Sequence, residues 1–318
     1  MSRPAEPSLA RFGANPLACH VAATRPAFLT ITLVACLIGL ATAHGSGVAI
    51  DPVLALLTLV FALVAHAGGN VINDFHDDVS GADAANTERL FPFTGGSRFI
   101  QNGVLTRAQT ARFGYGLLAL VIPAGLYLAW VSGPGLILIG LIGLFAGWAY
   151  SAPPLKLMSR GLGEVAIVAA WLTIVVGTDY VQRGAFSPLP VLAGLSYAML
   201  VANILYINQF PDHRGDAAAG KRTVVVIFGP PVAKWGYLIM AILAYAWLVA
   251  QVATDQLPQK CAAAALTLVL SFRAGRELIA HADEPAALGQ AIGLTIAAAN
   301  LHGLVLAAML AFTRWPGA

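Results

Sequence analysis

Long apolar runs set the strongest limit on how this chain can fold. A helix that spans a bilayer needs about 20 mostly apolar residues. The sequence contains nine candidate runs, at 26–43, 52–73, 109–131, 135–150, 163–182, 189–210, 233–253, 259–280 and 288–314. Only 10% of the 318 residues are charged, less than half the share of about 25% that is typical of soluble domains. The sequence therefore predicts an all-α integral membrane protein with nine transmembrane helices.

The basic residues indicate which ends of these runs share a side of the membrane. Cytoplasmic connections carry an excess of Lys and Arg. With the N-terminus inside, fifteen of the 18 basic residues fall in or beside inner segments, and the outer side keeps Arg183, Lys260 and Arg314. We therefore expect a cytoplasmic N-terminus. We also expect residues 1–24, rich in Pro and Ala, to be a mobile or interfacial segment ahead of a transmembrane domain at 25–318. A net charge of only +3 does not suggest a nucleic-acid partner.

Acidic residues gather where the second apolar run ends. Four of the fifteen carboxylates lie there, those of Asp74, Asp77, Asp78 and Asp83. Asn73 and Asp77 share a helical face, but the next step on that face is Gly81. Asp83 can reach the same site if Gly81 breaks the helix. Carboxylates at the mouth of an apolar helix are costly unless something offsets their charge.

A second acidic cluster follows the sixth apolar run. Asn208, Asp212 and Asp216 are spaced i, i+4, i+8, which places them on one face of a helix. Pro211 is expected to kink or end that helix. The basic residues put both clusters on the cytoplasmic side, so we expect them to face each other across a membrane-embedded pocket. The repeated pattern also indicates two four-helix halves plus one helix, in a ring around a central cavity.

The chemistry of the two clusters favours a divalent cation. Hard oxygen ligands suit Mg²⁺, which commonly brings a phosphate-bearing substrate. The alternative is that the acids are solvated loop residues, which is reasonable for Asp78, Asp83 or Glu88 taken singly. It does not explain an Asn/Asp pattern that occurs twice on the same side.

Basic, mostly glycine-containing segments lie beside the clusters. They are residues 93–98 with Arg98, residues 220–223 with Lys221 and Arg222, and residues 150–156 with Tyr150 and Lys156. Glycine loops and basic side chains suit a diphosphate and its metal ions. Each segment taken singly is also typical of a positive-inside anchor. Residues 220–223 are not a P-loop, because the upstream glycine spacing is missing and no strand precedes them.

At this point the motifs resemble those of the UbiA superfamily of intramembrane prenyltransferases. That family has nine transmembrane helices, with an N-D-x-x-D region after the second and a D-x-x-x-D region after the sixth. Here these are Asn73-Asp74-Phe75-His76-Asp77 and Asp212-His213-Arg214-Gly215-Asp216. The sequence is most similar to the menaquinone-type branch, the 1,4-dihydroxy-2-naphthoate polyprenyltransferases. That similarity rests on residues 77–83, 95–103, 160–182 and 216–223.

The resemblance implies roles for individual residues, with Mg²⁺ as the cofactor and a polyprenyl diphosphate as the donor. The metal ligands would be Asn73, Asp77, Asp83, Asn208, Asp212 and Asp216. The diphosphate would contact Asn70, Arg98, Tyr150, Lys156, Lys221 and Arg222. The catalytic residues would be Asp74, Asp77, Lys156, Asp212 and Asp216. Which of Asp74, Asp78 and Asp83 takes the place left by Gly81 stays open.

The resemblance also implies an aromatic, naphthoate-like acceptor and a lipid bilayer around the protein. The membrane would be a bacterial inner membrane, with the active site open to the cytoplasm. Other acceptors of such enzymes are 4-hydroxybenzoate, homogentisate, chlorophyllide and haem, and a terpene cyclase needs no acceptor. A cation-coupled transporter is the alternative from another class, but it predicts acids near mid-membrane rather than at one face.

Overall fold

The computed structural model describes residues 5–313, so Arg3 and Arg314, both part of the charge pattern above, lie outside them. Within this range the chain forms helices and loops without strands. Seven of the described helical segments are long and apolar enough to cross a bilayer. They are α3 (Thr30–Gly45) with the preceding turn η1 (Pro26–Leu29), α4 (Pro52–Ser80), α6 (Arg107–Ser132), α8 (Gly163–Arg183), α9 (Leu189–Ala218), α11 (Pro230–Ala253) and α13 (Gly289–Ala311).

Two expected spans differ from the other seven. The helix α7 (Gly135–Ser151) is apolar, but its 17 residues extend only about 26 Å against a hydrocarbon core of about 30 Å. The run at 259–280 forms a 3₁₀ helix, η3 (Gln259–Thr267), which continues as α12 (Leu268–His281). The all-helical membrane architecture is therefore confirmed, whereas nine crossings and the orientation of the N-terminus stay predictions.

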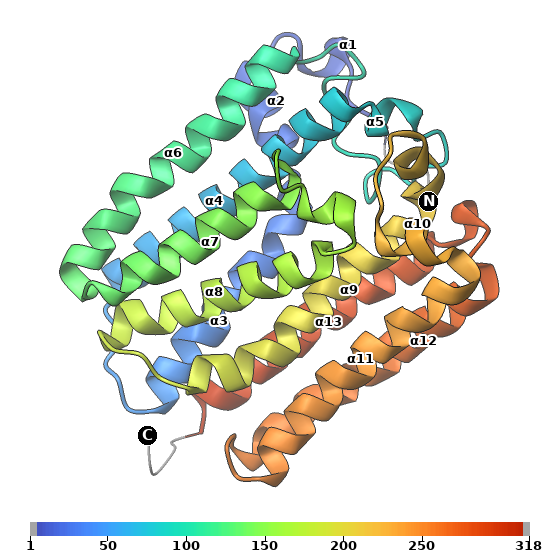
Figure 1. The fold of residues 1–318 in the computed structure, drawn as a ribbon. Coiled ribbons are helices and arrows are strands. Elements are labelled where there is room, and N and C mark those ends of the chain that lie inside the picture. Colours follow the sequence, from blue (N-terminus) through green and yellow to red (C-terminus); the bar gives the residue numbers. More distant parts are fainter. Residues whose placement is uncertain (1–4, 314–318) are drawn as a thin grey trace.

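The long helices lie alongside one another, and short helices gather at one end of the bundle (Figure 1). We call this the capped end. Its short helices are α1 (Leu9–Phe12), α2 (Pro16–Ala23), α5 (Ala82–Ala85) and α10 (Val224–Phe228). Two short 3₁₀ turns, η2 (Leu157–Arg160) and η4 (Pro285–Ala287), complete the described elements. Cys19 and Ala23 of α2 are buried against Phe99 and Leu105, so this N-terminal helix packs on the loop after α5.

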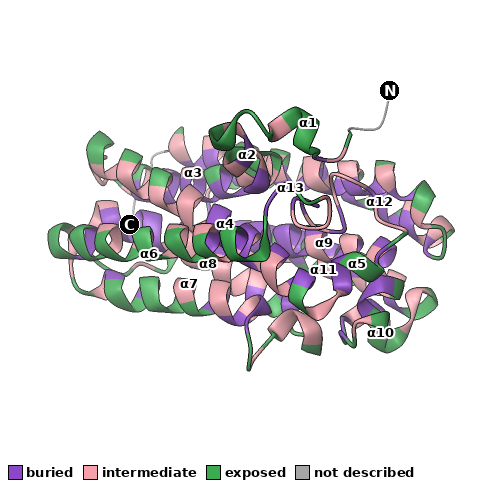
Figure 2. Ribbon diagram, turned by 90° about the horizontal axis from the view of Figure 1, so that it is seen from above, coloured by how far each residue is buried: buried purple, intermediate pink, exposed green. Residues whose placement is uncertain are grey.

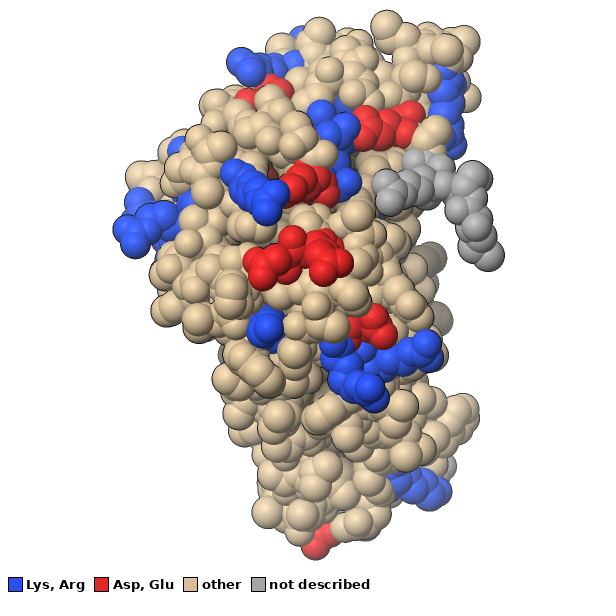
Figure 3. All heavy atoms as spheres, turned by 90° about the vertical axis from the view of Figure 1, so that its right-hand side faces the viewer, with Lys and Arg blue, Asp and Glu red and all other residues tan. Residues whose placement is uncertain are grey.

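Burial separates a central helix from peripheral ones (Figure 2). Of the 18 most apolar consecutive residues of α9, 72% are buried inside the bundle, whereas the corresponding share in α4 is 11%. Large apolar side chains such as Trp130 and Leu126 point outward, as expected of a surface that faces lipid. On the face in Figure 3, charged side chains gather in the upper part and the lower part is almost uncharged. A bundle that is charged mainly towards one end suits a membrane-embedded protein with its polar chemistry there.

The two acidic stretches differ in how their helices end. Gly81 adopts φ +81° and ends α4, which is the break that Asp83 needed. In contrast, α9 continues through Pro211 to Ala218, so the expectation that Pro211 could end the helix is wrong. Phe210 and Pro211 are both buried, and this packing outweighs the cost of a proline inside a helix, about 3 kcal/mol. The alternative, that Pro211 kinks the helix, stays a prediction.

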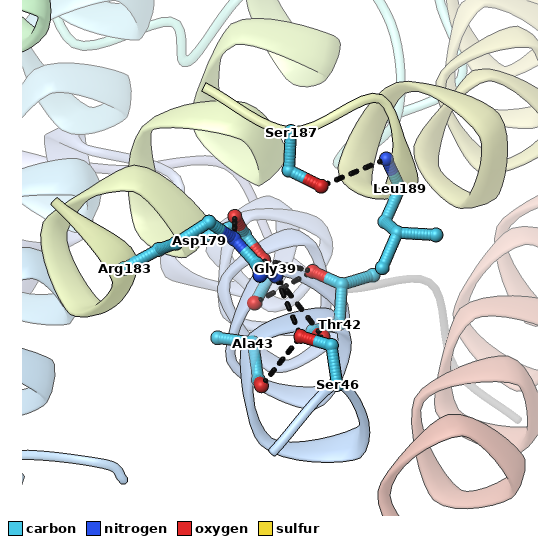
Figure 4. A network of polar contacts seen from close by, with 8 residues as sticks. All are labelled: Gly39, Thr42, Ala43, Ser46, Asp179, Arg183, Ser187 and Leu189. Atoms are coloured by element: carbon cyan, nitrogen blue, oxygen red, sulfur yellow. Dashed lines mark hydrogen bonds and ion pairs between the residues drawn. The ribbon is translucent and has the colours of Figure 1, made fainter. Parts of the chain in front are cut away.

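A network of polar side chains joins α3 to α8 at the end of the bundle opposite the capped end (Figure 4). The Arg183 guanidinium donates to both carboxylate oxygens of Asp179, over 2.8 and 2.9 Å, and to Ser46 Oγ over 2.7 Å. The Thr42 hydroxyl also donates to Asp179, over 2.8 Å. Asp179 is buried and each of its oxygens has a partner, so this network stabilises the contact between the two helices.

Candidate functional site

A cavity of about 440 Å³ runs between the helices and has mostly apolar walls. Its lining comes from η1, α3, α4, α6, α7, α8 and α9, whereas none of its lining residues belongs to α11, α12 or α13. The cavity therefore lies within one part of the bundle. Its lining residues Leu126 on α6 and Leu141 on α7 are exposed, so the cavity reaches the outer surface beside these two helices.

A second, polar cavity of about 110 Å³ lies at the capped end. Its walls include all six of the metal ligands expected from the sequence, Asn73, Asp77, Asp83, Asn208, Asp212 and Asp216. Five residues line both this polar cavity and the apolar cavity, namely Arg25, Asn73, Tyr150, Leu205 and Asn208. The two cavities therefore adjoin, with acids at one end and an apolar chamber at the other.

Helix geometry explains how the acids converge. Asn208, Asp212 and Asp216 lie on one face of α9, as their spacing predicts, and all three line the polar cavity. Asn73 and Asp77 line the opposite wall from α4, where the Asn73 amide donates to Asp77 over 3.2 Å. The two acidic motifs therefore face each other across one cavity.

Lys221 reaches the acids because of the turn that ends α9. Gly220 has φ +74°, its N–H donates to Ala217 O over 3.0 Å, and the Lys221 N–H donates to Asp216 O over 2.9 Å. This pattern is a Schellman motif, which reverses the chain. The Lys221 ammonium then lies 2.7 Å from Asp77 and 3.2 Å from Asp216. Burial alone would lower the pKa of Lys221, but the two carboxylates outweigh it and hold that pKa above its ordinary value.

Asp83 enters the polar cavity from α5, beside a glycine loop. Gly96 has φ +72°, and a Cβ at this position would lie 2.5 Å from Asp83 Oδ2, so only glycine fits. Burial, followed by the charges of Asp77 and Asp74, raises the pKa of Asp83 to about 9. An acid held this far from its ordinary ionisation in a cleft marks a candidate functional group.

The other two acids of the first stretch, Asp74 and Asp78, do not line the polar cavity. Asp74 is buried and accepts from the Ser97 N–H over 3.2 Å. Asp78 pairs with the guanidinium of Arg107 and accepts from Gln101. Neither lines the polar cavity, so the geometry favours Asp83 for the place left by Gly81.

The residues expected around the diphosphate are placed unevenly. Lys221 and Tyr150 line the polar cavity, and Asn70 lines the apolar one while donating to Thr24 O over 3.0 Å. Arg98 is buried outside the lining and donates to Asp83 O over 2.5 Å. Lys156 and Arg222 are exposed and line neither cavity. The role of each of these residues stays a prediction.

The structure adds site residues that the sequence reasoning missed. Arg25 lines both cavities and donates to Phe93 O over 2.9 Å. Asn86 lines the polar cavity and donates to Asp212 over 2.5 Å. Arg25 directly precedes the first span, where a basic residue indicates only which side of the membrane that end of the span faces. Asn86 follows no pattern in the sequence, because only the folded loop brings it to α9.

The donor set of the polar cavity fits a hard cation in its chemistry. The side-chain amide oxygen of Asn208, Oδ1, is buried and has no hydrogen-bond partner among residues 5–313. The same cavity is lined by the carboxylates of Asp77, Asp83, Asp212 and Asp216. Amide and carboxylate oxygens are the ligands that Mg²⁺ prefers. In the described part of the chain no three His, Cys, Asp or Glu side chains converge closely enough to hold an ion. The ammonium of Lys221 lies between two of these acids.

Comparison with known sequences gives one family. The profile of the UbiA prenyltransferase family matches residues 32–288. The 1,4-dihydroxy-2-naphthoate octaprenyltransferase of Mycobacterium tuberculosis is 31% identical over 71% of this chain and 77% of its own length. The enzyme of the same name from Escherichia coli is 29% identical over 64% of this chain and 67% of its own length.

Solved structures share the fold. A UbiA homolog from Aeropyrum pernix superposes with a TM-score of 0.67 at 16% identity, over 88% of this chain and 96% of that one. A UbiA homolog from Archaeoglobus fulgidus, solved bound to DMAPP and Mg²⁺, gives a TM-score of 0.64 at 16% identity, over 90% of this chain and 98% of that one.

Proposed function

Because this chain belongs to the UbiA prenyltransferase family, we propose that it transfers a polyprenyl group from a polyprenyl diphosphate to 1,4-dihydroxy-2-naphthoate, in a Mg²⁺-dependent reaction. The observation that carries the proposal is the junction of the two cavities. An acid-lined cavity opens into an apolar one through Arg25, Asn73, Tyr150, Leu205 and Asn208. A molecule with a charged head and a long apolar tail matches this arrangement.

The polar cavity would hold the head of the donor. Asn73, Asp77, Asp83, Asn208, Asp212 and Asp216 would hold Mg²⁺, which when bound offsets the negative charge that develops on the departing diphosphate. Arg25 and Lys221 line the same cavity. Their charged groups would donate hydrogen bonds to the oxygens of the diphosphate. Lys156, Arg98 and Arg222 would contact the diphosphate only if their loops move, because none of them lines the cavity.

The apolar cavity would hold the tail and protect the reacting carbon. The bond between the allylic carbon and the diphosphate oxygen breaks, and the electron-rich ring of the acceptor attacks that carbon to form a C–C bond. In the naphthoate reaction the ring carboxylate leaves as CO₂. Apolar walls exclude water, which would otherwise capture the allylic cation that remains when the diphosphate leaves. The opening beside Leu126 and Leu141 gives the tail a route into lipid.

The membrane arrangement that we propose has nine crossings and a cytoplasmic N-terminus, in a bacterial inner membrane with the acids facing the cytoplasm. The segment of η3 and α12 supports the count, because nine 3₁₀ residues and fourteen α-helical residues extend about 39 Å, more than the hydrocarbon core. Cysteine labelling of the loops in intact cells tests the sides. Residues 1–24 would be a separate segment before the transmembrane domain.

The experiment that tests the reaction uses purified protein in detergent, Mg²⁺ and a labelled polyprenyl diphosphate. The acceptors would be 1,4-dihydroxy-2-naphthoate, 4-hydroxybenzoate, homogentisate, chlorophyllide and haem. Product with the naphthoate alone is the expected result, and EDTA should silence the reaction until Mg²⁺ is restored. Product with a different acceptor would discard the naphthoate but keep the mechanism. Diphosphate release without any acceptor would indicate a cyclase.

A cation-coupled transporter is a weaker alternative. Acids at helix ends in a repeated fold motivate it, but here both motifs open into the cavity at the capped end. Counterflow of a substrate in liposomes, with no consumption of diphosphate, would favour the transporter.

A further inference from the structure

Lys221 is the basic residue that contacts both acidic motifs. Its ammonium lies 2.7 Å from Asp77 on α4 and 3.2 Å from Asp216 on α9. Among residues 5–313, no other Lys or Arg forms an ion pair with a carboxylate that lines the polar cavity. One side chain therefore bridges the two motifs.

The fold is built to place that ammonium. The Schellman turn fixes the backbone of Lys221 through two hydrogen bonds that do not involve its side chain. The residue is only 5% exposed, and a lysine is rarely buried unless it is paired. The single positive charge still leaves Asp83 and Asp212 without a basic partner among the described residues. Two of the four acids that line the cavity therefore form no ion pair with a basic side chain of the described residues.

We propose that Lys221 is an exchangeable counter-ion, which bridges Asp77 and Asp216 in the metal-free protein and leaves both when a divalent cation binds. This inference rests on the proposed function, because it requires that the polar cavity binds such a cation. The carboxylate oxygens that contact the ammonium are the ones that a metal would need, so the two cations compete. Once released, the ammonium has a flexible four-carbon stem with which to reach a diphosphate in the same cavity.

A merely structural lysine makes the opposite prediction. If Lys221 only holds the two motifs together, its loss should leave the carboxylates less well positioned and weaken cation binding. If it is exchanged, its loss should strengthen binding, because the site no longer has to be vacated first. The sign of the change separates the two roles.

The test is Mn²⁺ binding to the purified full-length protein, without prenyl diphosphate, with free Mn²⁺ measured by electron paramagnetic resonance. K221M removes the charge and keeps an apolar stem of similar length. K234M is the matched control, since among residues 5–313 the Lys234 ammonium donates one hydrogen bond, to the Ile279 carbonyl over 3.2 Å, and forms no ion pair. We expect K221M to bind Mn²⁺ about tenfold more tightly or better, since a full charge at contact distance is removed. K234M should stay within about twofold of the wild type.

Other outcomes are decisive as well. Mn²⁺ binding by the wild type with equal or weaker binding by K221M would overturn the exchange and leave the proposed function intact. No binding by either protein would overturn the metal site and the exchange with it. If K221M fails to fold, reductive methylation of the wild type decides. Saturating Mg²⁺ should speed methylation of Lys221 severalfold relative to Lys234, whereas an unchanged ratio would contradict the exchange.

Discussion

Two buried ionic networks at opposite ends of α8 show how differently one bundle can use charge. Near Arg183, one acid meets one guanidinium, and each oxygen of Asp179 has a donor (Figure 4). Near Gly163, about 30 Å away along the helix, four acids line one cavity and the ammonium of Lys221 pairs with two of them, Asp77 and Asp216. The first network is saturated and the second is not. A saturated network stabilises the fold, whereas an undersaturated one has capacity left for a ligand.

The largest expected effect is on catalysis at the undersaturated end. Asp212→Ala and Asp77→Ala should each lower the rate of prenyl transfer by about 10²–10³-fold, because each removes a cavity oxygen that the reaction needs. Thermal unfolding of the metal-free Asp212→Ala variant should not fall below that of the wild type, since Asp212 forms no ion pair among residues 5–313, whereas Asp77→Ala also removes a partner of the buried Lys221 and should unfold more easily. Full activity in either variant would end the assignment of these acids to the site.

Substitutions in the saturated network at Asp179 and Arg183 should change the stability of the fold rather than the rate of prenyl transfer. Asp179→Ala should lower the free energy of unfolding by about 3–5 kcal/mol, because it strands the Arg183 charge at a buried position. The double variant that also carries Arg183→Met should lose less, since neither charge is then left alone. Denaturant unfolding in detergent measures both. A double variant as unstable as the sum of the single changes would show that the pair is not coupled.

Asp78 follows Asp77 directly on α4 and provides a control for the substitution of Asp77. Its carboxylate pairs with Arg107, whose side chain is 62% exposed, and it does not line the polar cavity. Asp78→Asn should therefore change the rate of prenyl transfer by less than about threefold and the stability by less than about 1 kcal/mol. The same assays as for Asp77→Ala apply. A loss as large as that of Asp77→Ala would place Asp78 in the site after all.

The smallest effect is expected at the partly exposed ion pair of Glu6 and Arg89, near the capped end. Burial would raise the pKa of Glu6, but hydrogen bonds from Asn102 and Arg89 outweigh it, so that pKa lies below its ordinary value. A lowered folded pKa contributes stability above the unfolded value, and this contribution is lost as pH falls through the folded pKa. Glu6→Gln should therefore cost about 1 kcal/mol or less at neutral pH.

Thermal unfolding at several pH values measures the contribution of Glu6. The difference between the wild type and Glu6→Gln should shrink as the pH falls below the ordinary pKa of glutamate and vanish in acid, once Glu6 is protonated in the folded protein. A difference that persists there would indicate that shape, rather than charge, holds Glu6 against Arg89.

Periodicity alone predicted much of the candidate site. Asn208, Asp212 and Asp216 had to share a face if their stretch was helical, and they do. The expectation for Asp83 depended on a helix break at Gly81, which the backbone provides. Spacing could not decide which of Asp74, Asp78 and Asp83 lines the cavity. That choice depends on contacts with other segments, at Ser97, Arg107 and the loop of Gly96. The same limit applied to Arg25 and Asn86.

Local sequence failed where tertiary packing decided the outcome. Pro211 could have ended a helix, but α9 is the most deeply buried of the candidate spans and continues past it. The run at 259–280 is apolar enough for one helix, yet its first nine residues wind as 3₁₀ beside α11 and α13. In both places the neighbouring helices, rather than the intrinsic propensity of the segment, set the backbone.

The sequence by itself determined that this chain is helical and membrane-embedded, and that two acidic motifs end two of its helices. These properties follow from hydropathy and from the 3.6-residue period, which act within one segment. The tertiary structure alone decided which acids share a cavity, that this cavity opens into an apolar chamber, and that Lys221 after α9 contacts Asp77 on α4. Those contacts join residues far apart in the chain, and only the packing of the helices brings their side chains together.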